Sequence, residues 1–320
     1  MSFISSPVIG HNDHRYQLIA DWSKADAEKF PVNDCHEMVM DSRGRIILLT
    51  NETRNNILIY NKDGKLLDGW GSDYPGGHGL SLYNENGEEM LFICDHDRHQ
   101  VIKTDLAGRV LMIIDYPKET GVYSSAEQFM PTETAIAANG DIYVTDGYGL
   151  QYVIQYNDKG EYIRHWGGKG NGENQFDCTH GIVVDNRTRE KPSLIITSRN
   201  HNCFKRFTMD GNYIETISLP GSFVCRPVIK GELLYAAVFR SGSNTNFGSG
   251  YITILDEKNK VIATPGGSAP EYKNGRLSPQ HQQEKVFIHP HDVCIDDDEN
   301  IYVCQWNSGK AYPVKLERIK

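Results

Sequence analysis

The feature that most constrains this chain is a repeat of paired apolar strands that returns along its whole length. Each unit begins with an apolar segment, a tight polar turn and a second apolar segment, as in CHEMVMDSRGRIILLTN from Cys35 and PTETAIAANGDIYVTD from Pro131. A further hairpin follows, for example ILIYNKDGKLLDGWG, in which the DG pair suits a turn that needs positive φ. Units of four short strands are typical of β-propeller blades.

We therefore expect an all-β fold, a six-bladed β-propeller of the NHL-like type, in which residues 1–320 form a single domain. The last unit ends at AYPVKLERI and has three strands of its own. The segment YQLIADW near the N-terminus is predicted to supply the fourth strand of that blade. An N-terminal strand in the last blade would then close the ring.

Composition narrows the classes of function. The 33 Lys and Arg against 42 Asp and Glu give a net charge of −9, which disfavours binding to nucleic acid. No apolar run is long enough for a membrane helix, and MSFISSPVIGHNDHR lacks the pattern of a signal peptide. Seven Cys without C-x-x-C spacing predict no disulfide framework. We expect a cytoplasmic protein with a small-molecule substrate; the sequence leaves its oligomeric state open.

Histidine recurs at one position of the repeat, where the innermost strand of a blade begins beside the central channel. In the six units this position holds His36, His78, Thr132, His180, Arg226 and His291. Equivalent positions face a common axis, so imidazoles there can converge on one ion. The histidines of alternate blades, His78, His180 and His291, predict a three-histidine metal site, with zinc as first choice and iron, manganese or copper as alternatives.

A second ring of channel positions follows the next strand of each unit. It holds Glu52, His96, Tyr148, Arg199, Arg240 and Trp306. A tyrosine beside a metal can act as a base, and an arginine can hold a carboxylate through two parallel hydrogen bonds. We assign catalytic roles to His36, Glu52, Tyr148, Arg199 and Arg240, and substrate contacts to His96, Arg226, His289 and Trp306. For His36 a role as fourth metal ligand stays open. Cys35, Cys178 and Cys225 each precede a ring position, which predicts that their thiols face the blade packing.

At these residues the sequence resembles the NHL-repeat propellers, and among them the peptidyl-α-hydroxyglycine α-amidating lyases. The resemblance runs from about Cys35 to the end of the chain and is carried by HGLSL, PTETAIAANGDIYVTDGYG, NQFDCTHGIVV and PHDVCIDDDENIYV. It implies zinc ligands at His78, His180 and His291, a catalytic base at Tyr148 and an active-site arginine at Arg199. It also implies a structural calcium held by Asp292 and the backbone of Leu80.

The sequence also departs from that family. Glu52 stands where the lyases have an arginine that positions substrate, and His289 stands where they have a methionine. Met130 and Gly149 occupy the positions of one of the family's disulfide pairs. We therefore expect the metal chemistry to be kept while the substrate differs.

Three functions remain open. The first is a metal-dependent lyase that cleaves a C–N or C–O bond in a small polar, anionic substrate, or an epimerase working through the same intermediate. The second is a gluconolactonase-like lactone hydrolase, whose sites favour Glu, Asn and Asp around calcium over histidine. The third is a non-enzymatic NHL scaffold that binds a partner. The long loops 241–250 and 264–285 fit either a partner surface or a lid that brings His281 or Tyr272 to the substrate. The histidine ring favours the lyase.

Overall fold

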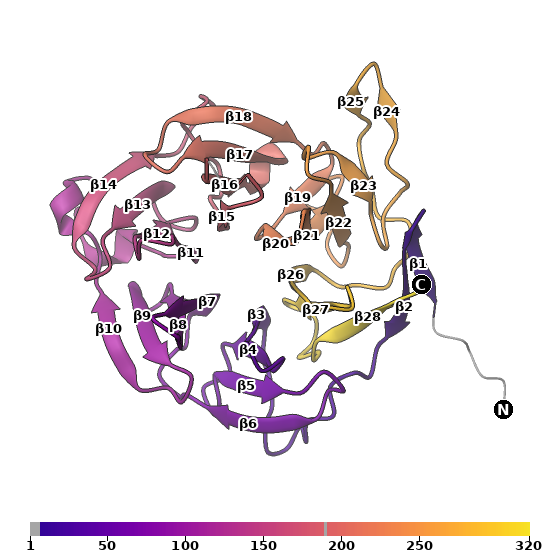
Figure 1. Cartoon of the computed structure of the whole chain (residues 1–320), viewed down its shortest axis with the longest axis horizontal. Coiled ribbons are helices and arrows are strands. Elements are labelled where there is room, and N and C mark those ends of the chain that lie inside the picture. The colour runs from indigo at the N-terminus through magenta and orange to yellow at the C-terminus, as the bar shows by residue number, and fades with distance from the viewer. Residues whose placement is uncertain (1–6, 189–190) are drawn as a thin grey trace.

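The computed structural model describes residues 7–188 and 191–320 and consists of antiparallel β-sheets arranged around a central axis (Figure 1). Six of these sheets are blades, each running from an inner strand beside the axis to an outer strand at the rim. The all-β, six-bladed propeller predicted from the repeat is confirmed.

Blades 1 to 4 each contain four consecutive strands. Blade 1 comprises β3 (Cys35–Met40), β4 (Ile46–Thr50), β5 (Ile57–Tyr60) and β6 (Leu66–Trp70). Blade 2 comprises β7 (Gly77–Glu85), β8 (Glu88–Asp95), β9 (Gln100–Asp105) and β10 (Val110–Ile114). Blade 3 comprises β11 (Glu133–Ile136), β12 (Ile142–Thr145), β13 (Tyr152–Tyr156) and β14 (Tyr162–Gly167). Blade 4 comprises β15 (Ile182–Asp185), β16 (Ser193–Ser198), β17 (Cys203–Thr208) and β18 (Tyr213–Ser218).

Blades 5 and 6 depart from this plan. The inner edge of blade 5 is divided between two short strands that both pair with the same neighbour: β19 (Ser222–Val224) and β20 (Val228–Lys230), followed by β21 (Leu233–Ser241), β22 (Tyr251–Leu255) and β23 (Val261–Ala263). Blade 6 comprises β26 (Pro290–Ile295), β27 (Ile301–Gln305) and β28 (Val314–Arg318), then β2 (His14–Ile19) and β1 (Val8–His11). Short 3-10 turns are η1 (Lys118–Thr120), η2 (Ala126–Gln128) and η3 (Arg199–His201).

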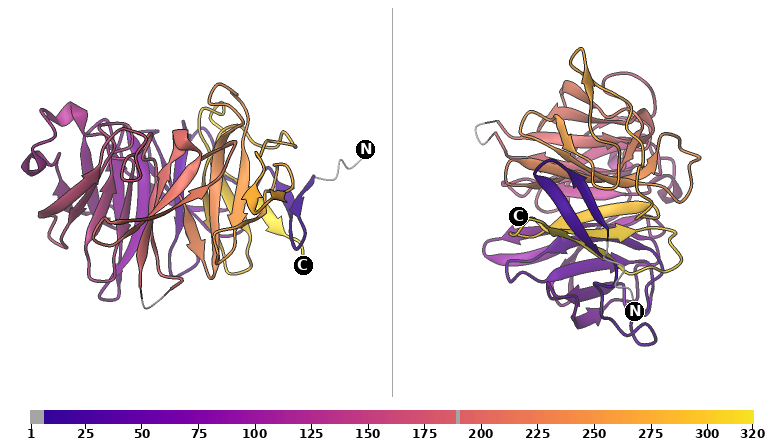
Figure 2. Two further views of the ribbon diagram at one scale, coloured as in Figure 1. Left: turned by 90° about the horizontal axis from the view of Figure 1, so that it is seen from above. Right: turned by 90° about the vertical axis from the view of Figure 1, so that its right-hand side faces the viewer.

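The N-terminal segment supplies the outer part of the last blade. Strand β2 pairs with β28, with Leu18 opposite Leu316, and β1 continues the sheet outward. Figure 2 shows these indigo strands beside the yellow C-terminal strand. Trp22, just beyond β2, donates a 2.9 Å hydrogen bond from Nε1 to the carbonyl of Lys62, which ties the segment to blade 1 as well. The two ends of the chain thus meet in one sheet.

The hairpin turns share one local arrangement. At the first turn of blade 1, Asp41 Oδ1 accepts hydrogen bonds from the backbone amides of Arg43 and Arg45, at 3.0 and 2.8 Å. Between them Gly44 has a φ of 74°, which glycine adopts without strain. The side chain that accepts two amides recurs at five further turns, at Asn61, Asp105, Asn157, Asp256 and Asp296. These Asp and Asn residues explain the regular spacing of strands.

The hydrophobic core consists of six layers, one between each pair of adjacent blades. Because a blade of a propeller is covered on both faces, its middle strands can be buried along their whole length, as every residue of IILLT in β4 and of ILIY in β5 is. The outer strand β6 is partly exposed. No helix in the described part of the chain is long and apolar enough to cross a membrane.

The two long loops of blade 5 lie in different places. The 264–285 segment carries the hairpin β24 (Tyr272–Lys273) and β25 (Arg276–Leu277), which extends from the rim (Figure 1). The Tyr272 hydroxyl accepts the amide of Val261 at 2.7 Å, so the alternative in which Tyr272 reaches the channel is wrong. The 241–250 loop instead contacts blade 6, where the amide of Gly248 donates to His289 Nε2 at 2.8 Å.

Candidate metal centre

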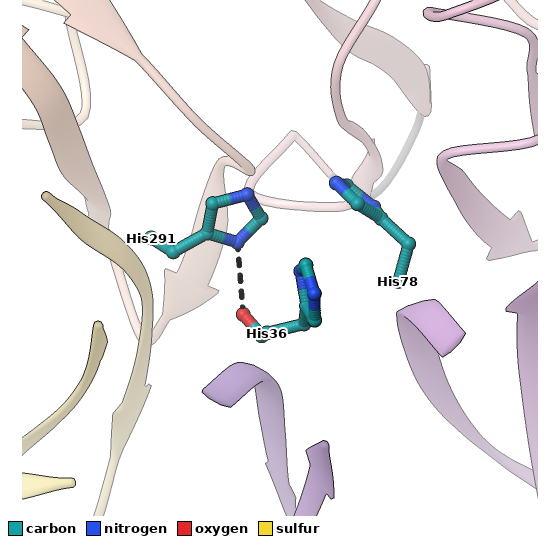
Figure 3. Close-up of side chains that lie close together, drawn as sticks. All are labelled: His36, His78 and His291. Carbon is teal, nitrogen blue, oxygen red and sulfur yellow. Dashed lines mark hydrogen bonds between the residues drawn. The ribbon is translucent and has the colours of Figure 1, made fainter. Parts of the chain in front are cut away.

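β-Bulges direct three of the ring histidines toward the axis. The pairing registers of β3 with β4, β7 with β8 and β26 with β27 shift at His36, His78 and His291 respectively. A bulge inserts one extra residue into a strand and re-aims its side chain. The three imidazoles therefore converge between blades 1, 2 and 6 (Figure 3). His180 lies just before β15 and is fully buried.

The glycine that follows the histidine in blades 2 and 4 has a steric cause. A Cβ atom on Gly79 would lie 2.4 Å from the carbonyl oxygen of Thr132. A Cβ atom on Gly181 would lie 2.6 Å from the Cα of Arg226. Neighbouring inner strands approach too closely for any other residue. The HG motifs thus bring adjacent blades together at the level of the histidines.

Four imidazoles form one buried cluster. The ring centroids of His78, His180 and His291 are 4.7, 4.8 and 4.9 Å apart, which is close to an equilateral triangle. The Nε2 atoms of His180 and His291 are 3.2 Å apart. His36 lies 5.0 Å from His78 and 5.1 Å from His291, centroid to centroid. None of the four is more than 3% exposed.

Hydrogen bonds to backbone carbonyls orient two of these rings. His78 Nδ1 donates to the carbonyl of Thr132 at 2.9 Å, and His291 Nδ1 donates to the carbonyl of His36 at 3.0 Å (Figure 3). Since a carbonyl only accepts, each Nδ1 carries the proton and each Nε2 presents a lone pair. The buried Nδ1 atoms of His36 and His180 have no partner among the described residues. Buried imidazole nitrogens that lack a hydrogen-bond partner are groups that a bound metal ion can satisfy.

Burial also keeps these rings neutral. It lowers the pKa of His78, His180 and His291 well below the ordinary value, and the neighbouring imidazoles lower it further. Burial, with a smaller contribution from His96, lowers the pKa of His36 to about 3. Neutral imidazole is the form that binds metal. Imidazole donors of this kind suit zinc, iron or copper, whereas manganese, the other metal expected from the sequence, prefers oxygen ligands.

A cysteine lies closer to this cluster than the sequence indicated. Two groups of potential ligands have all their donor atoms within 4.8 Å of one another: His36, His78 and His291, and His180, Cys225 and His291. The prediction that the Cys225 thiol faces only the blade packing is wrong. Cys225 directly follows β19, where the inner edge of blade 5 is interrupted. In the sequence, the only sign of this interruption is that the repeat is weak at CRPVIK.

Tyr148 and Arg199 lie against the cluster. The Tyr148 hydroxyl is 3.0 Å from His78 Nε2, although 37% of the residue is exposed at the channel mouth. Burial of the hydroxyl raises the pKa of Tyr148, and Arg199 opposes that shift. Arg199 donates to Cys225 Sγ at 3.0 Å and lies 4.7 Å from the Phe239 ring centre. Its contacts among the described residues include no carboxylate.

The remaining residues of the second ring line the mouth. The Arg240 guanidinium lies between two aromatic rings, 4.5 Å from Phe239 and 4.1 Å from Phe247, and its buried Nε has no partner in the described chain. His289 and Trp306 pack around Phe239, with ring centroids 5.3 and 5.4 Å from it.

On the opposite wall, the His96 ring lies 6.0 Å from His78, and its Nδ1 is 2.8 Å from the Asp97 carboxylate. Glu52 lies in the loop after β4, where its carboxylate pairs with Arg54 at 3.4 Å. The structure brings Glu52 to this arginine rather than to the cluster.

Two assignments deeper in the channel need correction. Arg226, expected to contact substrate, turns away from the mouth and donates to both carboxylate oxygens of Asp292, at 3.0 and 2.8 Å. It also donates to the carbonyl of Leu80 at 2.9 Å. The oxygens that were to hold a structural calcium are therefore taken by a guanidinium, and the residues present do not fit that ion.

Beyond Arg226 the channel opens into a second cavity at its far end. This cavity has a volume of ≈ 580 Å³ and is lined by Arg226 itself together with side chains of the inner strands, among them Met38, Ser81, Thr134 and Val293. None of the clustered histidines lines it. Arg226 thus lies between the histidine cluster and this cavity.

Comparison with known proteins supports the propeller fold and a relationship to NHL-repeat proteins and amidating lyases. A family described as "6-bladed beta-propeller" matches residues 134–283. NHL repeat-containing protein 3 of Homo sapiens is 24% identical over 229 residues, covering 62% of this chain and 65% of its own length. Peptidyl-alpha-hydroxyglycine alpha-amidating lyase 1 of Drosophila melanogaster is 31% identical over 274 residues, covering 78% of this chain and 46% of its own length. The chain spans less than two thirds of these relatives.

Solved structures add to the evidence for the fold alone. A gluconolactonase from Xanthomonas campestris superposes with a TM-score of 0.63 at 14% identity, covering 99% of this chain and 96% of its own. A streptogramin B lyase gives a TM-score of 0.57 at 13% identity, covering 90% of this chain and 94% of its own.

Proposed function

We propose that this six-bladed β-propeller, whose relatives include NHL-repeat proteins and α-amidating lyases, is a metal-dependent lyase for a small anionic substrate. The observation that carries the proposal is the triangle of His78, His180 and His291, with ring centroids 4.7 to 4.9 Å apart. Three buried neutral imidazoles with room for a further ligand are the usual arrangement of a catalytic zinc. When bound, such an ion polarises a substrate hydroxyl or carbonyl oxygen.

Tyr148 is the group placed to move a proton. Its hydroxyl lies 3.0 Å from His78 Nε2, on the side of the cluster that faces the mouth. Once His78 uses that nitrogen as a ligand, the hydroxyl is free to turn toward a substrate. Tyr148 would act as its phenolate, the form that a cation bound beside the hydroxyl favours. The phenolate takes the proton of a carbinol hydroxyl, a carbon–oxygen double bond forms, and the C–N or C–O bond breaks. The proton then passes to the leaving nitrogen or oxygen.

Two arginines give the site its preference for an anion. Arg199 is buried with no carboxylate among its contacts in the described chain, and Arg240 is held between Phe239 and Phe247. Buried cations are normally paired, because the isolated charge is costly to desolvate. A substrate carboxylate would supply that partner through charge-assisted hydrogen bonds.

The test is elemental analysis of untagged protein, wild type against His180→Ala. A matched control is His165→Ala, because His165 lies on β14 and contacts Tyr162 rather than the channel. We expect about one equivalent of transition metal in the wild type and the control, and its loss in His180→Ala. Metal-loaded protein is then offered carbinolamides and hydroxy acids that carry a carboxylate.

Three outcomes would contradict the proposal. If the wild type binds no transition metal, the non-enzymatic scaffold becomes the better interpretation. If it binds calcium alone at the histidine cluster, the lactone hydrolase does. If the protein binds the metal but turns over no carbinol substrate, the proposed metal site is supported and the proposed lyase activity is contradicted.

A further inference from the structure

One buried arginine joins several blades below the histidine cluster. Arg226 lies between β19 and β20 of blade 5, and four of its N–H groups have partners outside that blade. Nε and Nη2 bind Asp292 of blade 6, while Nη1 and Nη2 donate to the carbonyls of Leu80 and Met38 at 2.9 Å. Met38 belongs to blade 1 and Leu80 to blade 2. A single side chain therefore connects four blades.

Two further carboxyl groups lie near the Arg226 guanidinium, and together with its hydrogen-bond partners they form a shell of oxygen atoms around it. Glu37 Oε2 lies 3.7 Å from the guanidinium and accepts the amide of Leu80 at 2.6 Å. Glu133 Oε2 lies 3.5 Å from the guanidinium, and Oε1 accepts the amide of Thr134 at 2.8 Å. Glu37, Glu133 and Asp292 are all fully buried. A buried carboxyl group that keeps its charge needs a cation beside it, and the Arg226 guanidinium is placed to serve Asp292 in this way.

The shell is made of the atoms that calcium prefers. Carboxylate and backbone carbonyl oxygens, supplied from several segments, are typical calcium ligands. Here Asp292, Leu80 and Met38 direct those oxygens to Arg226, at 2.8 to 3.0 Å. A guanidinium is planar, keeps its charge at any relevant pH and matches a carboxylate with two parallel bonds. It also fills the space, so a metal ion and this side chain exclude each other.

We propose that Arg226 is the built-in structural cation of the channel, which takes the place of a bound calcium and fixes the inner strands that carry the histidines. Each bonded residue lies one or two positions after a clustered histidine: Met38 after His36, Leu80 after His78 and Asp292 after His291. Arg226 is thus a positioning residue for the cluster. This inference concerns the scaffold and holds whatever reaction the site performs.

The first test uses the unaltered protein. Thermal unfolding is followed in EGTA and in millimolar calcium, and calcium binding is measured by titration calorimetry. We expect no calcium binding in the channel and the same melting temperature in both buffers. A wild type that binds calcium and melts at a higher temperature because of it would overturn the proposal, even if every variant failed to fold.

The second test converts the site. Arg226→Ala removes the cation and leaves a cavity among three carboxyl groups, so we expect the melting temperature in EGTA to fall by on the order of 10 °C. Calcium should restore part of that loss, and magnesium should not, because it demands a smaller octahedral site. Arg226→Met is the matched control: it fills the space without charge, and should stay destabilised in either buffer. An Arg226→Ala protein as stable as wild type in EGTA would contradict the proposal.

A spectroscopic readout separates positioning from general stability. Cobalt is bound to the cluster in place of the native metal, and its visible spectrum reports the coordination of the histidines. In Arg226→Ala the spectrum should change in EGTA and return toward that of wild type when calcium is added. An unchanged spectrum would assign Arg226 to stability alone. If cobalt fails to bind wild type, the proposed metal centre fails, while the calcium measurements still decide the role of Arg226.

Discussion

At the scale of single residues, burial settles the protonation of the groups that form the cluster. The His36 ring is enclosed by His78 and His291 and is 3% exposed, so it has no access to the water that would stabilise a positive charge. The unfolded chain leaves the same imidazole free to bind a proton. A fall in pH therefore favours the unfolded state, which can bind a proton at this imidazole, over the folded state, which cannot.

We predict that this difference appears as a dependence of stability on pH. The pKa of His36 is about 3 in the folded protein against 6.5 for an ordinary histidine, so below pH 6.5 the unfolded chain binds a proton that the folded chain excludes. The contribution is complete above pH 6.5 and is lost as the pH falls, by about 1.4 kcal/mol per pH unit for one imidazole. Denaturant titrations of metal-free protein measure it. His36→Asn should have a slope that is shallower by one proton, and a slope equal to that of the wild type would contradict the prediction.

The Tyr148 hydroxyl gives a second prediction at this scale. Tyr148→Phe removes the proton-transfer group and leaves the three ligand histidines in place, so metal content should stay at the wild-type level. Turnover should fall by about 100-fold or more, with KM little changed. Tyr213→Phe is the control, since its hydroxyl contacts only Thr216 at the exposed edge of β18. A loss of metal together with activity would mean that Tyr148 supports the site rather than the reaction.

At the scale of strands, the close approach of neighbouring blades is what places the histidines. Gly79 has no room for a side chain, because a Cβ there would lie 2.9 Å from the Cα of Glu133 on the next blade. We predict that Gly79→Ala costs about 3 kcal/mol or more and weakens metal binding, because blades 2 and 3 must separate. Gly87→Ala is the control in the same hairpin: it has φ +93° but nothing within 4 Å, and should cost about 1 kcal/mol. Chemical denaturation and metal titration measure both effects; equal costs would contradict the steric argument.

The position of a residue along its strand could be predicted from the sequence, but the direction of its side chain could not always be. The repeat located His36, His78, His180 and His291 correctly, since a strand that returns every blade puts equivalent positions beside one axis. It could not show which way Arg226 points, because that depends on three carboxyl groups from other blades lying at the same height in the channel. Cys225 was misjudged because its strand is interrupted, so the alternation of sides on which the argument rested does not apply there.

At the scale of the whole molecule, the ring is held closed by pairing between the two ends of the described chain. Strand β2 supplies Tyr16 and Leu18 to the core layer between blades 5 and 6. We predict that removing residues through Ile19 lowers the melting temperature by on the order of 10 °C and promotes self-association, because β28 becomes an open edge. Removal through His11, which takes away only β1, is the control and should have a smaller effect. Calorimetry and light scattering follow the two quantities.

Arg226 and its partners also determine which parts of the channel are connected to one another. A propeller channel is commonly pictured as a tunnel, but here the histidines and the far cavity of ≈ 580 Å³ are on opposite sides of a buried arginine. Arg226 and its partners therefore separate the histidine cluster from the far cavity. Under the proposed function, substrate and product would both pass the side of the cluster where Tyr148 is exposed. Under the proposed function, a long substrate would therefore place one end at the cluster and leave the rest of its length in solvent.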